Sequence, residues 1–70
     1  MIETYLLEQL AAFHQYGTLS AAAQHLHLAQ PSLSRSMQKL ETLLGVSLFE
    51  RQKNRIVLNP TGALAAQHAE

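Results

Sequence analysis

Apolar and polar positions over the first sixteen residues alternate with the period of an α-helix. The apolar positions are Leu6, Leu7, Leu10 and Phe13, with Glu and Gln residues between them. This spacing predicts an amphipathic helix over residues 2–16, which Gly17 ends.

Two further helical patterns follow, separated by a short break at residues 27–29. Thr18 is a suitable N-cap for a short helix with the apolar stripe Leu19, Ala22, Ala23 and Leu26. Pro31 opens a longer helix, ended by Gly45, with the apolar stripe Leu33, Met37, Leu40 and Leu44. A short helix, a tight break and a longer helix are typical of the helix-turn-helix of DNA-binding proteins, although the pattern alone is a weak indication.

The next segment predicts a β-hairpin. Val46–Glu50 and Arg55–Leu58 are rich in β-branched or aromatic residues, and the polar residues 51–54 separate them. Asn54 suits the turn, because asparagine tolerates a left-handed backbone. We therefore expect a two-stranded wing beside the helices.

Asn59 and Pro60 provide an N-cap and a first-turn proline for a fourth helix that runs through Leu64, Ala65 and His68 to the end of the chain. The predicted fold is mainly α. Residues 1–58 would form a winged helix-turn-helix of three helices and a two-stranded β wing, and residues 59–70 would begin a linker or dimerisation helix.

The composition limits the chain to one small domain. Its 70 residues include no cysteine, so neither a disulfide nor a thiolate metal site can stabilise it, and a small core of leucine and alanine favours a dimer. No apolar run approaches the roughly 20 residues of a membrane span. Met1-Ile2-Glu3 leads directly into the helical pattern without a basic leader, so we expect no membrane association and a cytoplasmic location.

Charge is unevenly distributed, although the formal net charge is zero. Residues 30–58 contain all five basic residues and only two of the five acidic ones, a local net charge of +3. The basic residues are Arg35, Lys39, Arg51, Lys53 and Arg55. A cationic half of this kind is suited to the phosphates of a nucleic acid.

The outer face of the predicted third helix carries side chains able to bind DNA bases. Opposite its apolar stripe lie Pro31, Arg35, Gln38, Lys39 and Thr42, with Ser32 and Ser34 on the flanks. Arginine binds guanine in a bidentate manner, glutamine pairs with adenine, and serine binds a base edge or a phosphate. Periodicity alone, however, favours a plain solvated face, because most amphipathic helices have one.

A longer series of residues runs along the chain in order: Gly17-Thr18-Leu19, Ala22-Ala23, Leu26-His27-Leu28, Gln30-Pro31-Ser32-Leu33-Ser34-Arg35, Leu40-Glu41, Leu44-Gly45-Val46 and Leu48-Phe49-Glu50-Arg51. This series resembles the signature of the LysR-type bacterial transcription regulators over nearly the whole chain. So many residue types at matching offsets are far more specific than a single short motif, and the resemblance favours DNA reading over a plain solvated face.

The resemblance implies sequence-specific binding of double-stranded DNA as an operator-recognition domain. The third helix would enter the major groove, with Gln30, Pro31, Ser34 and Arg35 at the family's usual contact positions and Ser32 and Gln38 as secondary candidates. The wing would lie along the minor groove and backbone, where this chain has Lys53, Asn54 and Arg55.

The same resemblance implies that the fourth helix pairs with its twin in a homodimer, and we expect Leu64, Ala65 and His68 to form the contact. The apolar segment available for pairing comprises Ala63, Leu64, Ala65, Ala66 and Ala69. Because a twofold dimer presents two reading helices, the operator should be an interrupted inverted repeat. A small-molecule effector is expected only for a C-terminal domain outside these residues.

Three residues depart from the family's pattern. Ala29 stands where a capping Ser or Thr is frequent, so about 1 kcal/mol of cap energy is missing. Asn54 stands at the wing tip where Arg is frequent, which leaves Lys53 or Arg55 to enter the minor groove. Asn59 replaces a common Thr, but both residues cap helices well.

Other functions find less support in the sequence. Four histidines, His14, His25, His27 and His68, have no Cys or carboxylate at ligand spacing, so we expect no metal. Ser32, Ser34 and Ser36 lack an evident base, and the chain has no Asp, so we expect neither an enzyme nor a cofactor. The main alternative is a winged helix that binds protein, for which the cationic face would be incidental.

Overall fold

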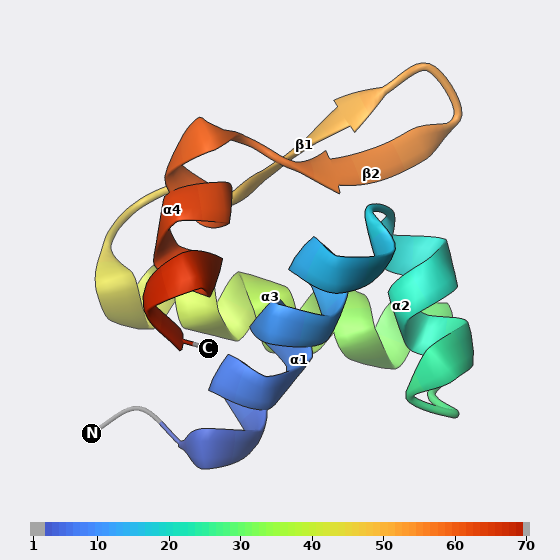
Figure 1. Cartoon of the computed structure of the whole chain (residues 1–70), viewed down its shortest axis with the longest axis horizontal. Helices are drawn as coiled ribbons and strands as arrows, with labels where there is room; N and C mark the ends of the chain where they lie inside the picture. Colours follow the sequence, from blue (N-terminus) through green and yellow to red (C-terminus); the bar gives the residue numbers. More distant parts are fainter. Residues whose placement is uncertain (1–2, 70) are drawn as a thin grey trace.

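The structure is a computed structural model that describes residues 3–69, and this part of the chain contains four helices and one β-hairpin. In order they are α1 (Thr4–Tyr16), α2 (Leu19–His25), α3 (Gln30–Leu44), β1 (Phe49–Gln52), β2 (Arg55–Leu58) and α4 (Pro60–Ala69). Figure 1 shows α1, α2 and α3 packed together, the hairpin extending over the α2 end, and α4 at the opposite end beside α1. The predicted winged helix-turn-helix with a following helix is confirmed.

Helices α2 and α4 begin at residues whose side chains cap them, and α3 ends at a glycine, as the sequence predicts. The Thr18 hydroxyl accepts a hydrogen bond from the Ala21 N–H at 3.1 Å, and Asn59 Oδ1 accepts one from the Gly62 N–H at 2.7 Å. Ala29 makes no side-chain cap at the start of α3, as its side chain dictates. Gly45 ends α3 at φ 72°, a left-handed conformation that glycine adopts readily.

The break between α2 and α3 contains a left-handed histidine that the sequence analysis did not anticipate. His27 has φ 58°; its N–H donates to the Gln24 carbonyl, and the Leu28 N–H donates to the Ala23 carbonyl. This is the Schellman arrangement that ends many helices, usually with glycine at the left-handed position. The partly buried Leu28 side chain packs on the core beside it, which supports the turn without a glycine.

The first strand of the wing differs from its prediction. It spans Phe49–Gln52 rather than Val46–Glu50, and the turn contains only Lys53 and Asn54. The antiparallel register from Phe49↔Leu58 to Gln52↔Arg55 leaves just two residues for the connection. The left-handed residue of this turn is Lys53, with φ 50°, and not Asn54.

A single hydrophobic core joins the helices. Its fully or nearly fully buried members are Leu6, Leu10, Phe13, Leu19, Ala22, Ala23, Leu33, Met37, Leu40, Leu48 and Ala66. Two positions correct the sequence analysis. Leu44, predicted on the buried stripe of α3, is 39% exposed because it lies on the last turn of that helix, and Ala66, assigned to the pairing segment, is buried in the core.

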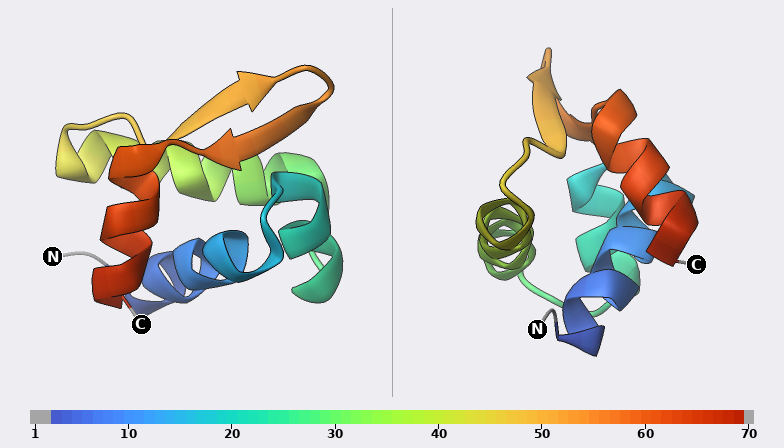
Figure 2. Two further views of the ribbon diagram at one scale, coloured as in Figure 1. Left: turned by 45° about the horizontal axis from the view of Figure 1, so that its top comes forward. Right: turned by 90° about the vertical axis from the view of Figure 1, so that its left-hand side faces the viewer.

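Helix α4 lies close to the backbone that precedes the wing, as the views in Figure 2 allow the reader to follow. The close packing of α4 against this backbone depends on Gly62. A Cβ atom placed there would lie 1.9 Å from the Leu48 carbonyl oxygen and 2.9 Å from a methyl carbon of Leu58. Glycine is therefore the residue that lets α4 pack at this distance.

Replacing Gly62 with alanine should destabilise the fold, although the same change in an open helix adds roughly 1 kcal/mol of stability. Steric overlap with backbone costs typically about 1–3 kcal/mol, so we expect at least that loss of unfolding free energy in Gly62→Ala. Urea unfolding followed by circular dichroism measures it, with Gln67→Ala at an exposed position of α4 as the control. Equal or greater stability of Gly62→Ala would show that α4 does not pack as described.

Candidate nucleic-acid interface

The exposed face of α3 is defined by the residues that the same helix buries. Leu33, Met37 and Leu40 point into the core, and at 100° per residue Arg35 lies on the opposite side. The exposed positions around it are Gln30, Pro31, Gln38, Lys39 and Thr42, and the half-buried Ser32 and Ser34 flank them. The predicted reading face is therefore open to solvent.

One flank of this face meets the wing. Two hollows lie between α3 and the hairpin, and Ser34, Arg51 and Ile56 line both of them. The first hollow adds Gln38, Phe49 and Glu50, and the second adds Leu19, Gln30 and Pro31. Gln30, Pro31, Ser34 and Gln38, four of the six candidates predicted on α3, thus gather beside the hairpin.

Arg51 belongs to this surface, and the sequence analysis missed it as a site residue. It was placed in the turn because the first strand was expected to end at Glu50. In the structure it lies within β1, opposite Ile56, and shares one side of the strand with Phe49. The spacing of Phe49 and Arg51 could have indicated this position, since residues two apart on a strand face the same way.

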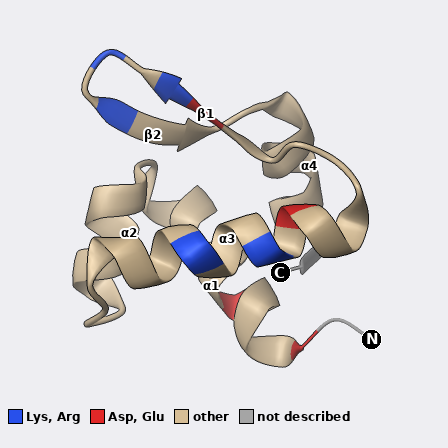
Figure 3. Cartoon of the chain, turned by 180° about the vertical axis from the view of Figure 1, so that it is seen from behind, with Lys and Arg blue, Asp and Glu red and all other residues tan. Residues whose placement is uncertain are grey.

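The wing tip carries the remaining predicted residues. Lys53, Asn54 and Arg55 are all exposed, and Lys53 and Asn54 form the turn. Among residues 3–69, Arg35, Arg51, Lys53 and Arg55 make no side-chain hydrogen bond or ion pair. Figure 3, in which α3 lies in front, shows basic positions along α3 and along the wing above it. These cations are free to meet an anionic partner.

Lys39 has a partner within the chain. Its Nζ lies 2.8 Å from Glu3 Oε1 and 5.9 Å from the centre of the Tyr5 ring. The hydrogen bond to Glu3, reinforced by the charge of that carboxylate, raises the pKa of Lys39 above its ordinary value. Lys39 therefore stays protonated, and its charge is neutralised at the edge of α3 that borders α1.

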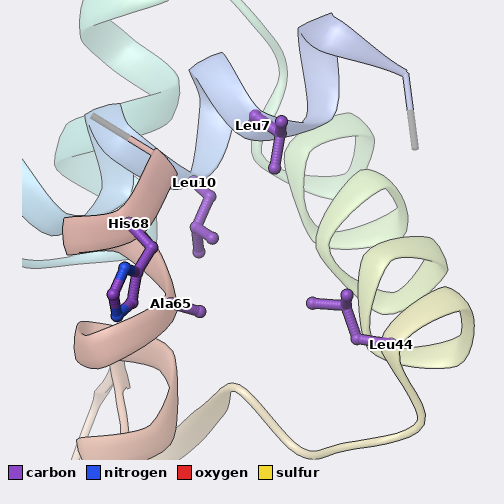
Figure 4. Close-up of a pocket in the computed structure, with 5 residues that line it drawn as sticks. All are labelled: Leu7, Leu10, Leu44, Ala65 and His68. Carbon is purple, nitrogen blue, oxygen red and sulfur yellow. The ribbon is translucent and has the colours of Figure 1, made fainter. Parts of the chain in front are cut away.

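A second surface lies at the other end of the molecule. Leu7, Leu10, Leu44, Ala65 and His68 line an apolar groove between α1, the end of α3 and α4 (Figure 4). Of the predicted dimerisation residues, Ala65 and His68 are in this lining, and Leu64 is 57% exposed. Leu64 therefore does not pack into the core of its own chain. The side chain of Ala69 lies outside the described residues.

The histidines are distributed over several elements. Within residues 3–69, no three His, Asp or Glu side chains are grouped so as to hold a metal ion. His25 stacks on Tyr16, with ring centres 3.7 Å apart and planes 5° from parallel. None of the helices in this part of the chain has the length and hydropathy of a membrane span.

Comparison with known proteins decides the family. The family model for bacterial regulatory helix-turn-helix proteins of the lysR family matches residues 5–63. The chain belongs to the LysR family. The matched residues run from α1 into α4, and the resemblance predicted from the signature residues is confirmed.

Relatives in the LysR family are much longer than this chain. The uncharacterized HTH-type transcriptional regulator YcgK of Bacillus subtilis is 40% identical over 65 residues, which are 93% of this chain and 20% of YcgK. The HTH-type transcriptional regulator TfdS of Cupriavidus pinatubonensis is 40% identical over 63 residues, 90% of this chain and 21% of TfdS. The chain thus spans about a fifth of these relatives, both of them transcriptional regulators.

Solved structures of LysR-family domains are similar over nearly the whole chain. The CbnR DBD–DNA complex has a TM-score of 0.86 and 38% identity, covering 97% of this chain and 78% of that one. The complex of the BenM DBD with benA site 1 DNA has a TM-score of 0.84 and 35% identity, covering 97% of this chain and 79% of that one. Both similar domains are bound to DNA.

Proposed function

We propose that this chain is the operator-binding domain of a LysR-type transcription regulator, with α3 in the major groove and the wing along the minor groove and backbone. The exposed face of α3, bordered by a wing whose cations have no partner among the described residues, is the observation that carries this proposal. The DNA complexes of similar domains support it. Binding of double-stranded DNA without catalysis and without a cofactor is the function we infer.

We infer two kinds of contact. Gln30, Pro31, Ser34 and Arg35 would meet base edges or nearby phosphates, with Ser32 and Gln38 in supporting positions, because their side chains have the reach and polarity for base edges. Lys53, Asn54 and Arg55 would act on the backbone and minor groove, since a hairpin tip with long cations fits phosphates better than bases.

We further propose that residues 1–58 form the DNA-binding unit and that residues 59–70 begin a linker helix that pairs two copies. Leu64, Ala65 and His68 would contribute to this homodimer contact, Ala65 and His68 from the apolar groove and Leu64 from the exposed side of α4. A twofold dimer would require an interrupted inverted repeat. We place the domain in the cytoplasm, where bacterial DNA lies. A small-molecule effector would act only on a further domain of a longer regulator.

Selection of duplexes from a random-sequence pool by the chain, followed by binding at two salt concentrations, tests this function. We expect enrichment of one motif repeated in inverted orientation. Affinity should fall as salt rises, because phosphate contacts release condensed counterions. A chain that enriches no sequence, or whose binding to duplex DNA is independent of salt, would contradict the proposal.

Arg35→Ala should reduce binding to the selected duplex by about 1–3 kcal/mol while changing binding to random duplex much less, because a bidentate contact to guanine is sequence-specific. Lys53→Gln is the contrast: it should weaken binding to both duplexes similarly, since phosphate contacts carry no sequence information. Titrations with the two duplexes separate these effects. Unchanged selective binding in a folded Arg35→Ala protein would remove Arg35 from the interface.

Arg51→Gln should weaken binding to both duplexes and lower the magnitude of the salt slope by about 0.9, the value for one phosphate contact. We expect this because Arg51 lines a hollow together with Gln30, Pro31 and Ser34 and has no anionic partner among residues 3–69. Titrations over a range of salt concentrations measure the slope, and circular dichroism checks the fold. A slope equal to that of the parent would show that Arg51 does not meet a phosphate.

Leu64→Glu should weaken self-association and operator binding together without unfolding the chain, because this side chain is 57% exposed. A carboxylate buried in an apolar contact between two copies is strongly unfavourable. Gln67→Glu, an equal change in charge at another exposed position of α4, is the control. Sedimentation measures association, and a Leu64→Glu protein that dimerises as the parent does would place the pairing surface elsewhere.

A further inference from the structure

The ion pair between Glu3 and Lys39 ties the start of α1 to the exposed face of α3. Its two charged atoms lie 2.8 Å apart, and the side chains of Lys39 and Glu3 are 49% and 51% exposed. Glu3 is the N-cap residue of α1, yet its side chain makes no cap hydrogen bond there. The carboxylate is directed to Lys39 across 36 positions of sequence.

The place of Lys39 on α3 puts it beside a DNA backbone if this helix occupies the major groove. Lys39 follows Arg35 by four positions and lies on the flank turned away from the wing, whereas Ser34 lies on the flank that lines the hollows under the wing. A helix with side chains is about 10–12 Å across, and the major groove is about 12 Å wide. Each flank of the helix would therefore face the phosphates of one strand.

We propose that Lys39 binds a backbone phosphate on the flank of α3 opposite the wing, and that Glu3 competes with this phosphate for the ammonium. The inference rests on the DNA-binding function proposed above. On binding, the phosphate replaces the Glu3 carboxylate as partner of Lys39, and Glu3 is left beside a polyanion. Glu3 thus lowers the affinity for every DNA sequence, because a phosphate contact carries no sequence information.

The competition between Glu3 and a phosphate for Lys39 weakens binding to all DNA, including DNA outside the operator. Lys39 already has an anionic partner in the free chain, so it releases fewer condensed counterions on binding than an unpaired lysine would. The contribution of Lys39 to the salt dependence is therefore partly suppressed. Removing the Glu3 carboxylate should restore the contribution of Lys39 to the salt dependence.

Four variants test this inference: Glu3→Gln, Lys39→Gln, the double variant, and Glu8→Gln. Glu8 is an exposed glutamate within α1 that makes no ion pair among residues 3–69, so Glu8→Gln makes the same change of net charge away from Lys39. Binding to the selected duplex and to a random duplex is measured at several salt concentrations. Circular dichroism establishes that each variant is folded.

Glu3→Gln should strengthen binding to both duplexes by about three- to tenfold at low salt and steepen the salt slope by up to about 0.9. Glu8→Gln should have a clearly smaller effect on both quantities. Lys39→Gln should weaken binding to both duplexes. In the Lys39→Gln background, Glu3→Gln should increase the affinity for DNA no more than Glu8→Gln does in the parent, because the cation that Glu3 holds is absent.

Equal effects of Glu3→Gln and Glu8→Gln would overturn the inference, since they would reflect net charge alone. Unchanged affinity in Lys39→Gln would also overturn it, by placing Lys39 away from the backbone. Either result, with the parent still selecting its duplex, would leave the proposed DNA-binding function standing. Failure of the parent chain to bind DNA would overturn both proposals.

Discussion

The backbone of Leu48 connects α3, the wing and α4. Its N–H donates to the Glu41 carboxylate at 2.8 Å, and its carbonyl accepts the Asn59 N–H at 3.0 Å. Its side chain is fully buried, and the absent side chain of Gly62 leaves room for its carbonyl against α4. One residue thus fixes the end of α3, the start of the wing and the start of α4.

This connection separates two surfaces. The reading face of α3 and the wing border one another, whereas the apolar groove lies between α1, the end of α3 and α4. Because Ala66 is buried against the core while Leu64 is exposed, α4 is held by its own chain on one side and open on the other. Contacts between two copies through such a helix, as proposed above, would set the relative positions of their α3 helices.

The positive charge available to a partner depends on ion pairing within the chain as well as on composition. The net charge is zero, yet four of the five basic side chains have no ion-pair partner among residues 3–69. The fifth, Lys39, is held by Glu3. Exposed pairs of this kind contribute little to stability, because water and salt screen them. The effect that matters here is the neutralisation of one cation at the edge of the reading face.

The sequence by itself determined the helices, the N-caps of α2 and α4, and the family, because these depend on residues close together in the chain or on the signature residues. Thr18 and Asn59 cap through atoms three residues away, and the apolar periods of α1 and α3 identify their buried sides. The outward position of Arg35 follows from the same period. The signature residues added the family and the candidate contacts of the wing.

Only the tertiary structure decided features that depend on distant partners. Strand β1 begins at Phe49, where the Glu41 carboxylate and not β2 accepts the Leu48 N–H, and this later start places Arg51 in the strand instead of the expected turn. Leu44 is exposed because α3 extends past the core, which its periodicity cannot reveal. Lys39 meets Glu3 across 36 positions, a contact that packing of α1 on α3 creates and that no local pattern encodes.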